Sequence, residues 1–70
     1  MENRYTVHIF WSDEDEGFIA VCDEFPGLSA FGSSREEALN EAETALNLMI
    51  EHYRESGQNL PKPKPVLVAV

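Results

Sequence analysis

Three short runs rich in apolar residues, separated by polar or turn-forming residues, predict three short strands in the first half of the chain. Residues 5–11 are rich in aromatic and β-branched types, which favour extended backbone, and residues 18–22 and 28–31 read the same way. The polar run at 12–17 ends in glycine, as hairpin connections do. Phe25-Pro26-Gly27 predicts a turn, because proline presets φ and glycine tolerates positive φ. We therefore expect an antiparallel three-stranded meander.

The second half of the chain predicts one long helix over residues 35–56. Ser34 and Glu37 have the spacing of an N-terminal capping box, and Gly57 can supply the left-handed stop. An apolar stripe about 140° wide marks the core-facing side, and it contains Ala38, Leu39, Ala42, Ala45, Leu46, Met49, Ile50 and Tyr53. Leu48 falls outside this stripe, on an acidic face that should lie in water.

The end of the chain predicts a proline-stiffened connector and a fourth strand. Residues 60–65 carry a proline at every second position, which excludes helix. Residues 66–70 are all apolar, as in a strand buried on both sides. The predicted fold class is α+β in the order β-β-β-α-β, and a right-handed crossover returns the fourth strand beside the first. The helix covers one face of the sheet, and nothing in the chain covers the other.

The length and the net charge of the chain limit the number of domains and the classes of partner that it can bind. Seventy residues make a single domain, 1–70, and 13 acidic against 5 basic residues give a net charge of −8. Such a chain should attract basic partners rather than nucleic acid. No apolar run approaches the roughly 18 residues that a membrane span needs, and the single cysteine suits the cytoplasm. Without disulfides or a metal, so short a chain is only marginally stable, which predicts a homo-oligomer, either a dimer or a tetramer.

The sequence contains no evident set of catalytic or metal-ligating residues. The predicted strands contain no Asp or Glu, so no carboxylate pair can hold divalent metals over the sheet. The acidic loop at 13–16 lacks the spacing of a calcium loop. Cys22 stands beside two acids, which raise rather than lower a thiol pKa, and His8 has no nucleophile motif near it. We predict no catalytic residue, no metal and no cofactor.

Several of these segments together resemble the HicB-like antitoxin family. The similarity runs in order through residues 5–7, 17–21, 25–27, 32–34 and 35–39 and continues into 60–63. The resemblance implies a partial ribonuclease-H-like fold and a role in binding and masking HicA, a small basic toxin that cleaves messenger RNA. Full HicB proteins continue into a DNA-binding segment, whereas this chain stops at Val70, so we assign no DNA binding. Cys22 stands where the family usually has proline.

Our hypothesis is a non-enzymatic antitoxin that covers the toxin's RNA-binding surface. The expected attraction comes from the acidic loop, and the expected apolar contacts come from exposed side chains. The candidate partner-binding residues are Trp11, Asp13, Glu14, Asp15, Glu16, Phe25 and Leu48. Two alternatives stay open: a solitary adaptor domain of the same family without a toxin, and a metal-dependent hydrolase built on the acidic loop.

Overall fold

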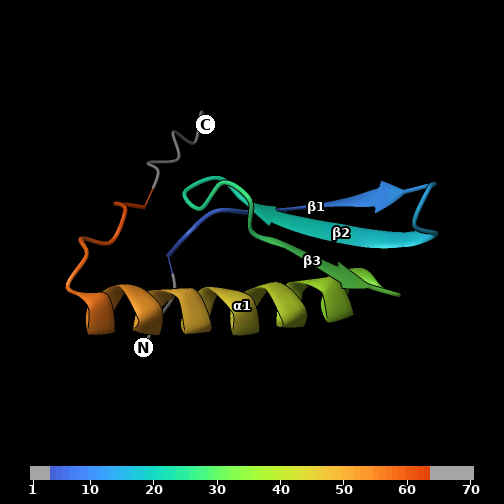
Figure 1. Ribbon diagram of the computed structural model, residues 1–70. Helices are drawn as coiled ribbons and strands as arrows, with labels where there is room; N and C mark the ends of the chain where they lie inside the picture. Colours follow the sequence, from blue (N-terminus) through green and yellow to red (C-terminus); the bar gives the residue numbers. More distant parts are fainter. Residues whose placement is uncertain (1–3, 64–70) are drawn as a thin grey trace.

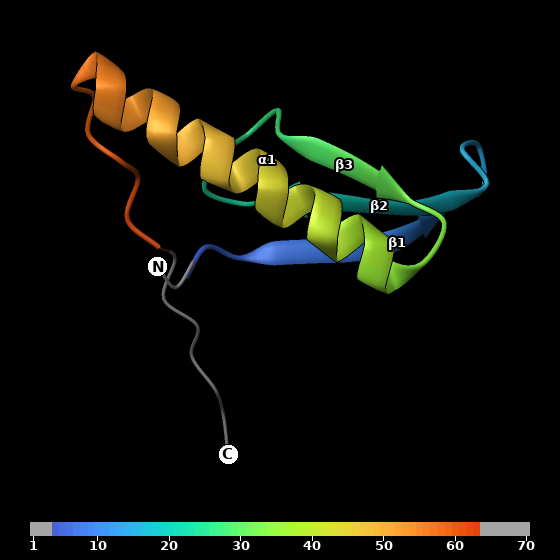
Figure 2. The ribbon, with the colours of Figure 1, turned by 90° about the horizontal axis from the view of Figure 1, so that it is seen from below.

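The computed structural model describes residues 4–63, which form a three-stranded sheet with one long helix on one face (Figures 1 and 2). Strands β1 (Val7–Ser12), β2 (Gly17–Cys22) and β3 (Ser29–Gly32) are followed by helix α1 (Arg35–Ser56). The strand order is β1-β2-β3, and both pairs are antiparallel. The predicted α+β layout, with its antiparallel meander and its long helix, is confirmed.

The strand boundaries differ slightly from those predicted, because side-chain bonds and a turn take over at the ends. Strand β1 begins at Val7 rather than at residue 5, since the Thr6 N–H and hydroxyl donate to the Glu24 carboxylate at 2.9 and 3.1 Å. Strand β3 begins at Ser29, since the Leu28 N–H donates to the Phe25 carbonyl at 3.1 Å and closes the turn.

The helix has the predicted bounds, and its caps explain them. The Ser34 hydroxyl accepts from the Glu37 N–H at 3.1 Å. The Glu37 carboxylate reaches back to the Ser33 N–H, at 3.1 Å, one residue before the cap itself. Gly57 has φ of 74°, and its N–H bonds the last turn of the helix, as left-handed stops do. Local sequence therefore sets both ends.

One face of the sheet packs tightly on the helix. Ala20 of β2 lies against Ala38 and Ala42, and all three are fully buried. Small side chains let the two layers approach closely. At Gly32 the approach is tighter still, because a Cβ there would overlap the backbone of Glu37 and Ala38. The alanines of the predicted helical stripe are thus the contact between layers.

The other half of the core is aromatic and lies toward the C-terminal end of the helix. The Phe25 ring stands edge-on between Tyr5 and Tyr53, with centroid distances of 5.0 and 5.5 Å. It is only 4% exposed and packs with Leu46 and Cys22. The prediction of Phe25 as an exposed partner contact is corrected by this burial: the turn folds the ring inward, because an aromatic side chain gains more from the core than from water.

The structure describes part of the predicted connector and none of the predicted fourth strand. The fourth strand, residues 66–70, lies outside the described residues, as does Lys64 of the connector. Within the described part, Tyr5 donates its hydroxyl proton to the Pro61 carbonyl at 2.7 Å and so ties the connector to the start of β1. No helix among residues 4–63 is both long enough and apolar enough to cross a membrane.

Candidate partner-binding surface

The connection between β1 and β2 presents the densest run of acidic side chains at one end of the molecule. Residues 13–16 are all exposed, and the hairpin extends beyond the first turn of α1 (Figure 1). Asp15 is held in place by Ser12, whose hydroxyl donates to Oδ2 at 2.9 Å and accepts from the Asp15 N–H at 3.3 Å. The loop is therefore an ordered turn whose carboxylates face water.

Trp11 joins this loop to the end of the sheet. Its indole N–H donates to Asp13 Oδ1 at 2.7 Å, and its ring stands edge-on to Phe18 at 5.2 Å. The Arg35 guanidinium carbon lies 4.8 Å from the centre of the Phe18 ring, on the first turn of α1. Trp11 remains 52% exposed. We call Trp11 with residues 13–16 the hairpin end.

Backbone strain is concentrated at the last position of the loop. Glu16 has φ of 51°, and it is the non-glycine residue with positive φ among residues 4–63. This left-handed conformation costs a residue with a Cβ about 1 kcal/mol. Turns of this kind are usually filled by Gly, Asn or Asp. A fourth carboxylate stands there instead, which extends the acidic run.

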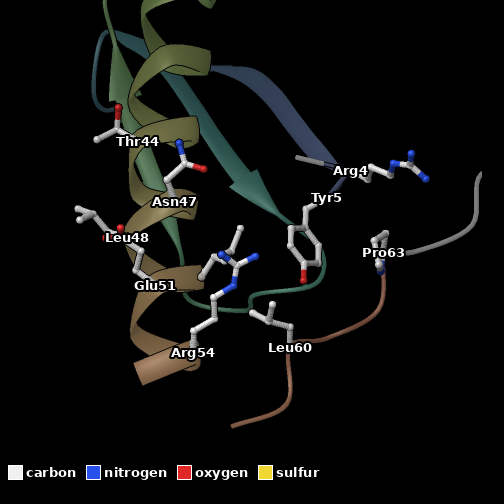
Figure 3. A pocket seen from close by; sticks show the side chains of 10 residues that line it. Arg4, Tyr5, Thr44, Asn47, Leu48, Glu51, Arg54, Leu60 and Pro63 are labelled. Carbon is white, nitrogen blue, oxygen red and sulfur yellow. The ribbon is translucent and has the colours of Figure 1, made fainter. Parts of the chain in front are cut away.

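A second candidate surface, which is hollow, lies beside the C-terminal half of α1. A pocket of about 610 Å³ opens between the helix, the start of the chain and the connector. Figure 3 shows Tyr5, Leu60 and Pro63 facing the helix across it, with Leu48 projecting at its outer rim. Leu48 is 63% exposed, as its position outside the helical stripe predicts. The lining also includes Arg4, Arg54 and Glu51, so the pocket has mixed charge.

The structure brings some of the candidate residues together and separates others. Trp11 and residues 13–16 form one continuous surface. Leu48 belongs to the pocket at the opposite half of the helix, and Phe25 is in the core. Two exposed rings, Phe10 at 48% and Phe31 at 47%, were not among the candidates. The signal for Phe10 was its aromatic side chain in the row of the first strand opposite Trp11.

The pKa values of two groups, the Cys22 thiol and the Tyr5 hydroxyl, are raised, which favours their neutral forms. Burial, before any other cause, raises the pKa of the Cys22 thiol, and the nearby Glu24 carboxylate adds to the effect. The Cys22 sulfur lies 3.5 Å from Glu24 Oε1. Burial and Glu24 likewise raise the pKa of the Tyr5 hydroxyl. A thiol kept protonated is a poor nucleophile, so Cys22 acts as a small core residue.

Side chains that could ligate a metal are scattered over the described part of the chain. Between residues 4 and 63, no three side chains of the types His, Cys, Asp and Glu gather closely enough to hold an ion. His8 Nε2 lies 2.9 Å from Asp23 Oδ2, and this pair stands at the sheet surface with the histidine side chain 57% exposed. The pair is a surface contact that joins β1 to the turn after β2.

Comparison with known proteins identifies the family. The family model described as HicB_like antitoxin of bacterial toxin-antitoxin system matches residues 4–68. Searches of curated proteins and of solved structures gave no match. The match extends over the strands, the helix and the connector described above, and over nearly the whole length of the chain. The chain therefore belongs to the HicB-like antitoxin family of bacterial toxin-antitoxin systems.

Proposed function

We propose that this chain neutralises a small basic ribonuclease toxin of the HicA type by binding over its RNA-binding surface, using the hairpin end. Membership of the antitoxin family supports a toxin partner. The observation that carries the choice of surface is that Trp11, half exposed, is hydrogen-bonded into a run of four exposed carboxylates.

The chemistry of this surface suits a basic protein. RNA-binding proteins present lysine and arginine to phosphates, and a run of carboxylates competes for the same cations. Long-range attraction raises the association rate, while a buried aromatic anchor slows release. Trp11 is the side chain of the hairpin end that is large, flat and accessible enough to serve as the anchor. Attraction and anchoring are thus supplied by adjacent residues.

The proposal also includes the expected absence of catalysis, the cellular location and the fourth strand. The chain acts without catalysis, in the cytoplasm where messenger RNA is translated, and its fold is completed by a fourth strand in a partial ribonuclease-H-like arrangement. The adaptor alternative differs in one respect only: no toxin is present to be bound. A metal-dependent hydrolase would require a tight, stoichiometric magnesium, manganese or calcium site at the acidic loop, which titration calorimetry measures directly.

Co-expression with the adjacent open reading frame tests the proposal. A small basic protein should co-purify, and its cleavage of RNA should be suppressed by stoichiometric antitoxin. Trp11→Ala should weaken the complex by roughly 30-fold, about 2 kcal/mol, which is the size of an interface hot spot. The matched control is Leu48→Ala, an exposed apolar truncation on the helix that should leave affinity within a factor of three.

Two results would contradict the proposal. The antitoxin function fails if the neighbouring protein neither binds nor cleaves RNA, and the adaptor alternative then takes its place. The hairpin end fails as the binding surface if Leu48→Ala weakens the complex more than Trp11→Ala does. Trp11 also packs on Phe18, so its truncation can affect folding as well as binding. Circular dichroism of each variant is therefore measured, so that unfolding is not mistaken for the loss of a binding contact.

A further inference from the structure

The sheet has a second face, turned away from α1, that the proposed toxin contact does not use. Side chains alternate along each strand, and those of Val7, Ile9 and Ala20 point to the helix. The register then places the remaining side chains on the opposite side. We call this set the outer face; it consists of His8, Phe10, Ser12, Gly17, Ile19, Val21, Ser29 and Phe31. Figures 1 and 2 show the helix on one side of the sheet only.

An aromatic row crosses the centre of the outer face. Phe10 is paired with Ile19, and Ile19 with Phe31, so one apolar residue from each strand lies in the same line. The two rings are 48% and 47% exposed, far more than core phenylalanines. A Cβ at Gly17 would overlap the Phe31 ring, so that ring lies down over the glycine. The result is a low apolar surface rather than a projecting side chain.

The distribution of charge indicates what covers this surface. None of the residues in the three described strands is Asp, Glu, Lys or Arg, although the whole chain has 13 acidic and 5 basic residues. The carboxylate at its edge, Asp23, lies 2.9 Å from His8. A basic toxin would find no opposite charge on the outer face and would be drawn to the hairpin end instead. The outer face is suited to an equally uncharged surface.

We infer that the outer face packs against the outer face of a second copy of this chain. Two stacked sheets lie about 10 Å apart, with both helices on the outside. The acidic helices then stand on opposite sides of the dimer, separated by more than the Debye length of about 8 Å at physiological salt. The net charge of −8 on each copy is thereby kept out of the contact.

This arrangement leaves the hairpin end free in both copies. The hairpin connection projects past the end of α1, and Trp11 belongs to the helix-side row of β1, not to the outer face. Self-association and toxin binding therefore use different residues. The assembly is a four-layer sandwich, helix-sheet-sheet-helix, in which each sheet is buried on both faces. This inference stands on the outer face alone and does not depend on the toxin proposal.

Sedimentation equilibrium of the full chain between 1 and 200 µM tests the inference. The wild type should be a dimer, and Phe31→Glu should weaken dimerisation at least a hundredfold, because a twofold contact contains each substitution twice. Phe10→Thr with Phe31→Thr is a second variant that keeps residues favourable to strands and should also yield monomers. The matched control, Leu48→Glu, places the same charge on the exposed helix and should remain dimeric.

Four other outcomes would overturn the inference. A wild-type chain that is monomeric throughout this range has no such contact. A dimer that survives Phe31→Glu, with unchanged circular dichroism, uses another surface, and dissociation by Leu48→Glu would point to the pocket on the helix. If Phe31→Glu abolishes toxin binding but not dimerisation, the outer face belongs to the toxin. Trp11→Ala should weaken toxin binding and leave the dimer intact. The toxin proposal and the dimer proposal are therefore tested by different variants and can fail separately.

Discussion

At the scale of single residues, Glu24 stabilises the join between the start of β1 and the turn after β2. Its carboxylate accepts from the Thr6 N–H at 2.9 Å and from the Thr6 hydroxyl at 3.1 Å. The same oxygen that meets the N–H lies 3.5 Å from the Cys22 sulfur. An acidic side chain in the turn is thus used inside the fold, whereas the acids of residues 13–16 are left in water.

The pKa values of Cys22 and Tyr5 predict that the fold weakens in alkali. Burial and Glu24 raise both pKa values above their ordinary values of 9.0 and 10.0, so the folded chain holds its protons more tightly than the unfolded one. Their contribution is fully present below pH 9 and is lost as pH rises through the folded-state pKa values. Urea unfolding from pH 7 to 10.5 should show a falling free energy of unfolding.

Two variants separate the contributions to this pH dependence. Cys22→Ala should flatten the decline near pH 9, and Tyr5→Phe should flatten the part that begins near pH 10. Both variants will be less stable at pH 7, because Cys22 is buried and the Tyr5 hydroxyl bonds the Pro61 carbonyl. An unchanged slope in both variants would show that other groups control the alkaline transition.

At the scale of secondary-structure elements, the contact between α1 and the sheet depends on small residues. Ala20, Ala38 and Ala42 are fully buried where the layers meet, and Gly32 ends β3 beneath the first turn of the helix. The helix stripe was predicted from periodicity, but a periodicity does not show how near a sheet lies. The close approach is a property of the pair of elements.

Gly32→Ala should destabilise the protein by about 2 to 3 kcal/mol, the cost of overpacking a tight contact. Its Cβ would lie 2.8 Å from the Ala38 Cα and the Glu37 carbonyl carbon, and these backbone atoms cannot turn aside as a flexible side chain can. Urea unfolding measures the change. Gln58→Ala, an exposed position outside both the contact between the layers and the outer face, is the control and should change stability by less than about 0.5 kcal/mol. Equal stability of the two variants would refute the close approach.

At the scale of the whole molecule, charge and apolar surface are separated. Four carboxylates stand together at the hairpin end, while the described strands carry no charged side chain. The outer face is apolar at its centre, and α1 exposes acidic residues along its outer side. A basic partner and a second copy can therefore bind this small chain at different places.

Neutralising the hairpin end should slow toxin association rather than speed its release. With Asp13→Asn, Glu14→Gln, Asp15→Asn and Glu16→Gln combined, we expect an association rate about tenfold lower at low salt and a weaker dependence on salt. The amides keep the acceptors used by Trp11 and Ser12. Surface plasmon resonance at several salt concentrations measures both rates.

A charge-matched variant controls for net charge. Four neutralised helix acids, at Glu41, Glu43, Glu51 and Glu55, remove the same charge from another surface and should reduce the association rate less. Equal effects of the two quadruple variants would mean that the toxin responds to total charge and not to the hairpin end.

Sequence by itself determined the features that depend on neighbours along the chain. The helix bounds, both caps, the three strands and the exposure of Leu48 follow from spacing that acts within a few residues. The grouping of Trp11 with the acidic loop was also within reach, because they are adjacent in sequence. Phe25 was misplaced, since nothing near it in sequence shows that Tyr5 and Tyr53 meet it from either side.

Only the tertiary structure decided which row of the first strand meets the helix. Both rows are mixed and apolar enough to be buried, so alternation alone left the choice open. The helix lies over Val7 and Ile9 because its alanines fit closely against Ala20 and Ala30. Phe10 and Phe31 are too large for that approach and are left on the outer face. The physical reason is that packing depends on the shapes of surfaces brought together from distant parts of the chain, which no local pattern contains.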